Sequence, residues 1–199
     1  MPTINGKACV INGTPVDKVF SNGKQVYGRN LLINTSSSAT NGKTSMQGSG
    51  PAIFGVYSRT NSYEQVIANY DPGDGKEFFY RFISPDTNNL NGLTPGTTYT
   101  LSGSASHTTF PLYFRYGYAI NGGWIENVLD LGIPVSDGSV FKPFSETFTI
   151  PTLATGVYIS LQIMDYVNGS LFRFKNMKLE KGTTATPWTP APEDVGVTS

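Results

Sequence analysis

Short runs of β-favouring residues, each closed by a turn sequence, constrain the fold of this chain more than any other feature. In these runs apolar or aromatic side chains alternate with polar ones, which is the period of a strand with one buried face. Turn sequences such as Thr94-Pro95-Gly96 and Asn121-Gly122-Gly123 separate them. The pattern predicts an all-β fold, an antiparallel two-sheet β-sandwich of the jelly-roll type. The expected strands are Ala52–Ser58, Glu77–Ile83, Thr97–Ala105, Leu112–Ile120, Glu146–Ile150, Val157–Asp165 and Leu171–Leu179.

The N-terminal residues 1–28 are predicted to form a small β-hairpin arm. Asn22-Gly23 lies between two β-prone runs, and both residues accept the positive φ of a type I′ turn. An arm this short has no core of its own, so we expect it to connect rather than to bind. The chain then divides into the arm at 1–28, a jelly-roll module at 29–190 and a linker at 191–199 to a following segment.

Two segments depart from the strand pattern. Residues 34–50 are mainly Ser, Thr, Asn and Gly without apolar periodicity, which predicts a loop. In the segment 62–70, Tyr63, Val66 and Ile67 have helical spacing, and Ser62 with Gln65 would form a capping box. A helix of this length is marginal, so we expect a strand, with a single helical turn as the alternative.

The charge balance excludes several classes of partner. Lys and Arg total 14, Asp and Glu total 14, and the net charge is zero. Binding to nucleic acid or to an anionic membrane surface needs a positive field, so neither partner is expected. The chain has no apolar run long enough to span a bilayer and no visible signal peptide. We therefore expect synthesis in a cytoplasm, which does not exclude a later place on a virion.

The sequence has few residues that could serve in catalysis or bind a metal ion. The single cysteine, Cys9, and the single histidine, His107, disfavour zinc sites and a Ser-His-Asp triad. A glycoside hydrolase would need a pair of carboxylates, and only Glu77, Glu126 and Asp165 are plausible. We expect no enzyme activity and no cofactor. Ca²⁺ at Asp71, Asp74 and Glu77 is a weaker alternative to a simple Gly-Asp-Gly turn.

The side chains that alternation directs away from the core suggest a ligand. A sugar ring has an apolar face, on which aromatic rings stack, and a rim of hydroxyls, which amide and guanidinium groups bind. A mixture of this kind faces outward on three predicted strands, and Trp124 follows a tight turn beside them. The candidate carbohydrate-binding residues are Trp124, Tyr113, Arg115, Arg81, Phe79 and Gln162.

Three of the candidates also have a structural interpretation. Trp124 could cover a satellite core beneath a loop. Arg81 and Arg115 could be solvated residues paired with Glu77 or Glu126. Trp188, in a proline-rich segment, is expected to close one end of the sandwich rather than to bind a ligand.

Four stretches of the sequence match the pattern of known modules. The sequence Asn30-Leu31-Leu32-Ile33-Asn34 follows the pattern that opens many jelly-roll modules, and residues 172–194 are similar to their closing segment. Residues 17–32 resemble the connector that leads into them, and residues 94–103 match a recurrent inner strand. Together these stretches resemble carbohydrate-binding modules in tail proteins of phages that infect lactobacilli, lactococci and streptococci, and the resemblance covers residues 17–194. It assigns Phe174, Asn176, Leu179 and Trp188 to the scaffold.

The resemblance implies a module that recognises host cell-wall polysaccharide. Such modules occur as insertions in evolved distal tail proteins and in accessory baseplate or receptor-binding proteins. The expected partners are therefore the polysaccharide and other tail or baseplate proteins, and the expected location is the phage tail, acting at the host cell surface. The alternatives are a structural baseplate adaptor that binds another tail protein and, with less support, a cell-wall glycoside hydrolase.

Overall fold

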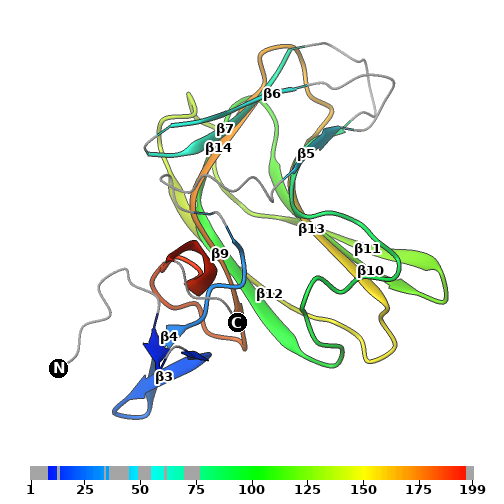
Figure 1. Ribbon diagram of the computed structural model, residues 1–199. Coiled ribbons are helices and arrows are strands. Elements are labelled where there is room, and N and C mark those ends of the chain that lie inside the picture. Colours follow the sequence, from blue (N-terminus) through cyan, green and yellow to red (C-terminus); the bar gives the residue numbers. More distant parts are fainter. Residues whose placement is uncertain are drawn as a thin grey trace.

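The computed structural model in Figure 1 describes residues 9–12, 14–33, 35, 45–48, 55–60, 62–69 and 77–195. Their secondary structure consists of strands and one 3-10 turn, η1, at Pro192–Val195. The expected all-β class is therefore confirmed. The strands are β1 Val10–Ile11, β2 Thr14–Pro15, β3 Lys18–Ser21, β4 Lys24–Gly28, β5 Ser45–Gly48, β6 Gly55–Arg59, β7 Glu64–Ala68, β8 Glu77–Ile83, β9 Thr98–His107, β10 Leu112–Ile120, β11 Gly123–Asp130, β12 Lys142–Thr149, β13 Gly156–Met164 and β14 Leu171–Lys181.

Two five-stranded sheets form the sandwich. Sheet I has the order β11-β10-β13-β8-β5, and sheet II has the order β12-β9-β14-β7-β6. Each neighbouring pair within them is antiparallel. Figure 1 shows β14, β9 and β12 of sheet II on the left and β13, β10 and β11 of sheet I on the right. The predicted antiparallel two-sheet sandwich is therefore confirmed.

Alternation along the strands directs apolar side chains between the two sheets. Phe114 and Leu161 of sheet I are fully buried there, as are Leu101 and Phe174 of sheet II. Aromatic rings meet across the core, and the ring centroids of Tyr80 and Phe174 lie 4.7 Å apart. Burying one such side chain stabilises the fold by about 1.5–3 kcal/mol, so this core supplies the main driving force for the sandwich.

Strands with clean alternation lie where the sequence predicts them. The expected Glu77–Ile83 and Leu112–Ile120 are found with these bounds as β8 and β10. The segment with mixed helical and strand signals is the strand β7, Glu64–Ala68, paired with both β6 and β14. Because the sheet satisfies the backbone of β7 on both sides, pairing outweighs the local helical spacing.

Two strands depart from the expectation. β5, Ser45–Gly48, lies in a stretch predicted as a loop, and β11, Gly123–Asp130, was not expected as a strand. Both are edge strands of sheet I and obtain their hydrogen bonds from one neighbour, β8 and β10 respectively. An edge strand has weaker burial constraints, so its apolar alternation is weak and the sequence signal is lost.

The opening and closing segments of the module meet at Asn30, whose side chain is fully buried. Its Nδ2 donates hydrogen bonds to the carbonyl oxygens of Met177 at 3.2 Å and Thr189 at 3.0 Å. Its Oδ1 accepts from the amides of Leu32 at 3.0 Å and Leu179 at 3.2 Å. Two motifs that carry the resemblance therefore form one hydrogen-bonded cluster, which explains Asn at the start of the module.

A buried ion pair lies beside this cluster on β14. Lys178 and Glu180 are fully buried, with 3.7 Å between Lys178 Nζ and Glu180 Oε1. Thr186 joins them, since its hydroxyl accepts from Lys178 Nζ at 2.6 Å and donates to Glu180 Oε2 at 2.8 Å. Burial lowers the pKa of Lys178, while Glu180 opposes that shift. The pair fixes the segment after β14 against sheet II.

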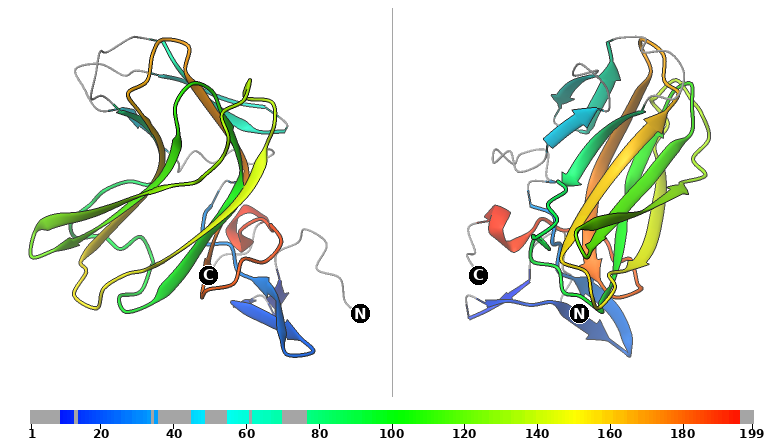
Figure 2. Two further views of the ribbon diagram at one scale, coloured as in Figure 1. Left: turned by 180° about the vertical axis from the view of Figure 1, so that it is seen from behind. Right: turned by 90° about the vertical axis from the view of Figure 1, so that its right-hand side faces the viewer.

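The hairpin arm and η1 lie close together at one end of the sandwich (Figures 1 and 2). Asn22 and Gly23 have φ of 51° and 74°, as the predicted type I′ turn requires. Arg29 forms an ion pair with Glu193, and Ala191 is fully buried. Residues 191–194 thus pack against the rest of the chain. The division into arm, module and linker stays a prediction.

Candidate functional site

The outer face of sheet I brings the sequence-predicted residues together. Cross-strand pairing places Tyr113 of β10 opposite Gln162 of β13, and Gln162 opposite Phe79 of β8. In the next row Ser160 pairs with both Arg115 and Arg81. Trp124 of β11 pairs with Ala119 and has the same parity as these residues. All six candidates therefore share one face, which we call the arginine face; their role in binding stays a prediction.

Arg115 is the centre of a hydrogen-bond network on this face. Its Nη1 donates to both carboxylate oxygens of Glu77 at 2.6 Å and to Gln162 Oε1 at 3.1 Å. Its Nη2 donates to Glu126, and its Nε donates to the Tyr158 hydroxyl at 3.0 Å. The pairing of Arg115 with both acids matches the structural interpretation. Arg115 organises the face and has little remaining capacity to bind a ligand.

Protonation states follow from this network. Burial would lower the pKa of Arg115, but hydrogen bonds to Glu126 and Glu77 outweigh it and raise the pKa. Burial would raise the pKa of Glu126, but hydrogen bonds with Arg115 and Tyr158 outweigh it and lower the pKa. Burial raises the pKa of Tyr158, and its hydrogen bond with Glu126 adds to the shift. Near neutral pH, Arg115 and Glu126 are charged and the phenol of Tyr158 is protonated.

Arg81 has a different position from Arg115. Its guanidinium carbon lies 4.3 Å from the centroid of the Phe79 ring and 5.9 Å from that of Tyr158. Its side chain forms no hydrogen bond or ion pair within the described part of the chain. Burial lowers the pKa of Arg81. Stacking fixes the plane of the guanidinium while its N–H donors stay free, as a ligand-binding arginine requires.

Tyr158 also belongs to this face but is not among the six residues predicted from the sequence. It is 4% exposed, and a Cβ on Gly117 would lie 2.3 Å from its Cε1 atom. Glycine at 117 therefore leaves the space that the Tyr158 ring fills. Trp124 packs against the same ring with 5.2 Å between centroids and a 64° angle between planes. Strand parity directs Tyr158 outward, but only the structure shows that it supports Trp124 and contacts both arginines.

On this face, a side chain that points away from the core is not always accessible to solvent. Phe79 is 4% exposed and Gln162 is 0% exposed, so the expectation that they contact a ligand directly needs correction. Arg81 stacks on Phe79, and Arg115 donates to Gln162. They lie beneath the residues that solvent reaches. Trp124, Tyr113, Arg81 and Arg115 are half-buried.

Two of the acidic candidates are engaged by Arg115. Glu77 and Glu126 are both ion-paired with Arg115. Asp71 and Asp74 lie outside the described residues, so the calcium site predicted with them is not described. Among the residues that are described, no group of three or more His, Cys, Asp or Glu could hold a metal ion. The same part of the chain contains no helix long and apolar enough to cross a membrane.

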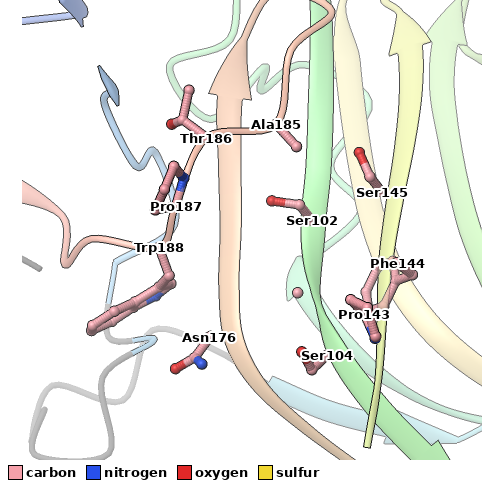
Figure 3. A pocket seen from close by; sticks show the side chains of 11 residues that line it. Ser102, Ser104, Pro143, Phe144, Ser145, Asn176, Ala185, Thr186, Pro187 and Trp188 are labelled. Atoms are coloured by element: carbon pink, nitrogen blue, oxygen red, sulfur yellow. The ribbon is translucent and has the colours of Figure 1, made fainter. Parts of the chain in front are cut away.

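A concave region lies on the outer face of sheet II. This groove, shown in Figure 3, has a volume of about 590 Å³. It crosses β14, β9 and β12 and is bounded by the segment after β14. The resemblance assigns Asn176 and Trp188 to the scaffold, and the structure places both in the lining of this groove. We call it the serine groove after Ser102, Ser104 and Ser145, which also line it.

Comparisons with known proteins identify the fold. No protein-family model and no curated protein matches the chain. Among solved structures, the tripod (BppUct-A-L) from the baseplate of bacteriophage Tuc2009 is similar, with 22% identity and a TM-score of 0.56. The match covers 85% of this chain and 61% of that one.

Two further structures broaden the comparison. The enzymatically active domain of tailspike protein 4 of bacteriophage CBA120 has 13% identity and a TM-score of 0.56, over 77% of this chain and 21% of that one. The C-terminal family 22 carbohydrate-binding module of Clostridium thermocellum Xyn10B has 15% identity and a TM-score of 0.52, over 80% of this chain and 97% of the module. The chain thus has a β-sandwich fold shared by carbohydrate-binding modules and by parts of phage tail and baseplate proteins.

Proposed function

We propose that this chain is a non-catalytic carbohydrate-binding module of a phage tail protein, which attaches the tail to host cell-wall polysaccharide through the arginine face. The observation that carries the proposal is Arg81, stacked on Phe79 with free N–H donors beside the aromatic pair Trp124 and Tyr158. Trp124, supported from beneath by the buried Tyr158 ring, offers a stacking surface, and Arg81 offers directed donors to the same sugar ring.

The charge of the face favours a neutral ligand. Arg115 is neutralised by Glu77 and Glu126, so an ionic ligand would compete with an existing network. Arg81 then contributes hydrogen bonds and one positive charge close to the two aromatic rings. Weak binding per module is sufficient, because several copies on one tail raise the effective concentration of sites.

The state of the two acids supports a non-catalytic role. A glycoside hydrolase needs a general acid that stays protonated near neutral pH, which requires a raised pKa. The pKa of Glu126 is lowered, and Glu77 is held by the same guanidinium as Glu126. We expect no release of reducing sugar from purified cell wall. Release that Glu77→Gln or Glu126→Gln abolishes would contradict this.

Binding to cells tests the adhesive role. Fluorescently labelled protein should attach to Gram-positive cells of a susceptible strain and to polysaccharide purified from that strain. Trp124→Ala should lower the affinity about thirtyfold, since an aromatic anchor contributes about 2 kcal/mol. Ile125→Ala is the matched control, because Ile125 is the next residue of β11, is 48% exposed and faces the other side of the sheet. Equal loss in both variants would count against the arginine face.

An adaptor that binds another tail protein is the second candidate function. The observation in its favour is exposed apolar surface on the arm, where Ile11 is 62% and Phe20 is 60% exposed. Exposed apolar groups of this kind mark protein contacts more often than sugar contacts. Phe20→Ser should then impair incorporation into tails and leave attachment to cells unchanged. If Phe20→Ser instead leaves incorporation into tails unchanged and weakens attachment to cells, the carbohydrate-binding role alone would be favoured.

A further inference from the structure

We propose that the serine groove on sheet II is a second binding site and that its ligand is a neutral oligosaccharide. The groove lies on the sheet opposite the arginine face and shares no residue with it. Its volume of about 590 Å³ falls within the range of about 300–1,000 Å³ usual for ligand sites.

Free hydroxyl groups line the floor of the groove. Ser102 pairs with Ser145 across β9 and β12, yet neither hydroxyl has a hydrogen-bond partner in the described residues, and the same holds for Ser104. Ser102 as a residue is only 9% exposed, and its hydroxyl lines the groove without a partner among the described residues. Such a group is stabilised when a ligand supplies the missing hydrogen bond.

Two pairs of threonines on the same face of β9 and β12 have hydroxyls that are hydrogen-bonded to each other. Outside the groove, Thr98 and Thr149 are hydrogen-bonded at 2.8 Å, and Thr100 and Thr147 at 3.1 Å. The ladder therefore changes from paired to unpaired hydroxyls where the groove begins.

A β-bulge adds an amide to the groove. The pairing of β14 with β9 shifts between Lys175 and Lys178, and Asn176 within the bulge has φ of 54°. This left-handed conformation is tolerated by Asn and leaves its side chain exposed at the groove without a partner in the described part of the molecule. A side-chain amide has donors and an acceptor, which suits the hydroxyl groups of a sugar.

Trp188 supplies a fixed aromatic surface. Its Nε1 donates to Thr35 Oγ1 at 3.4 Å, and Thr35 Oγ1 in turn accepts from Asn30 Nδ2 at 3.1 Å. The indole is therefore held by the cluster at the start of the module. In Figure 3 Trp188 lies on one side of β14, and Ser102, Ser104 and the β12 residues lie on the other. A chain of two or more sugar rings is needed to contact both.

Among the described residues, the lining contains no charged side chain, which favours a neutral ligand. The nearest cation in sequence, Lys175, has its Nζ 4.2 Å from the centroid of the Phe141 ring. An extended peptide is a poorer candidate, since β14 and β9 are hydrogen-bonded on both sides and Pro143 removes a donor from the free edge of β12.

The chain has two tryptophans, one on each face, and this allows the groove to be tested by itself. In the Trp124→Phe variant, Trp188 is the only tryptophan, so its emission and its quenching by acrylamide report the groove. The probes are N-acetylglucosamine oligosaccharides of increasing length and neutral glucose and galactose oligosaccharides.

We expect at least one probe to protect Trp188 from quenching in a saturable manner. Ser102→Ala should then raise the Kd about fivefold, the equivalent of one hydrogen bond. Thr149→Ala, on the same face of β12 as Ser145 but outside the groove, should leave the Kd unchanged. Absence of protection by every probe, or equal Kd values for Ser102→Ala and its parent, would overturn the proposal. The arginine face is read separately through Trp124, so either site can fail without the other.

Discussion

The two outer faces of the sandwich differ in whether their polar side chains have hydrogen-bond partners within the protein. On the arginine face, one guanidinium engages two carboxylates, an amide and a phenol, so that most polar groups are paired within the protein. In the serine groove, three hydroxyls and an amide have no such partners in the described residues. Long charged side chains can reach each other across rows of a sheet, whereas serine reaches only its nearest neighbour. Availability to a ligand is therefore a property of side-chain length and pairing as well as of strand parity.

The comparison also separates residues within the arginine face. Arg115 and Arg81 face the same way on strands of one sheet, but Arg115 is fully engaged and Arg81 is not. Substitution of Arg115 should therefore act mainly on stability, and substitution of Arg81 mainly on binding.

The largest effect is expected at the buried ion pair of sheet II. Glu180→Gln leaves the Lys178 ammonium buried without its counter-charge, which should lower the free energy of unfolding by about 3–5 kcal/mol. Urea unfolding near neutral pH, followed by tryptophan emission, measures this. Glu146→Gln, a half-buried glutamate on the edge strand β12, is the control and should change stability by less than about 0.5 kcal/mol. Similar losses in both variants would contradict the special role of the pair.

A smaller loss of stability is expected from the network on sheet I. Arg115→Met removes the shared partner of Glu77 and Glu126 and should cost about 1–3 kcal/mol, less than a fully buried pair because both acids reach solvent. Arg81→Met removes no hydrogen bond to the described residues and should cost less than about 1 kcal/mol. If the two variants unfold at the same urea concentration, the distinction between the two arginines is wrong.

The pH dependence of stability should identify Glu126 as part of that network. Its pKa is lowered in the folded protein, so its contribution is complete above its unfolded value of about 4.3 and is lost as the pH falls through the folded value. Near neutral pH the parent protein should therefore have a higher free energy of unfolding than Glu126→Gln, and this difference should shrink as the pH falls below about 4.3. Urea midpoints measured between neutral and acidic pH test this, and a constant difference at all pH values would argue against it.

The smallest effect should separate paired from unpaired hydroxyls. Thr100 shares hydrogen bonds with Thr147 at 3.1 Å and with the carbonyl of Gly182 at 2.7 Å, so Thr100→Ser should keep them and Thr100→Ala should cost about 1 kcal/mol. Ser102→Ala loses no hydrogen bond to the described residues and should change stability by less than about 0.5 kcal/mol. A cost at Ser102 equal to that at Thr100 would show that the groove hydroxyl has a structural role.

The sequence predicted the parts of the fold that local alternation determines. Leu112–Ile120 has strict alternation, and both its bounds and its outward residues Tyr113 and Arg115 follow from that pattern. Phe79 and Gln162 also face outward, but their burial depends on side chains from other strands, which parity does not describe.

The serine groove could not be predicted in the same way. Its floor depends on a bulge at Asn176, and its wall depends on Trp188, which is oriented through Thr35, more than 150 positions earlier in the chain. Contacts at such separation leave no periodic signal in the sequence. The role of each candidate residue in binding remains a prediction for both faces.

Tryptophan emission from the arginine face tests the proposed binding surface most directly. In the Trp188→Phe variant, Trp124 is the only tryptophan, and titration with purified host cell-wall polysaccharide should change its emission in a saturable manner. Arg81→Ala in that background should raise the Kd about tenfold or more, since hydrogen bonds from a charged donor contribute about 1.5–3 kcal/mol. Ile125→Ala should leave the Kd unchanged. Polysaccharide that binds the protein without altering Trp124 emission, and with equal Kd for Arg81→Ala and its parent, would contradict binding at the arginine face.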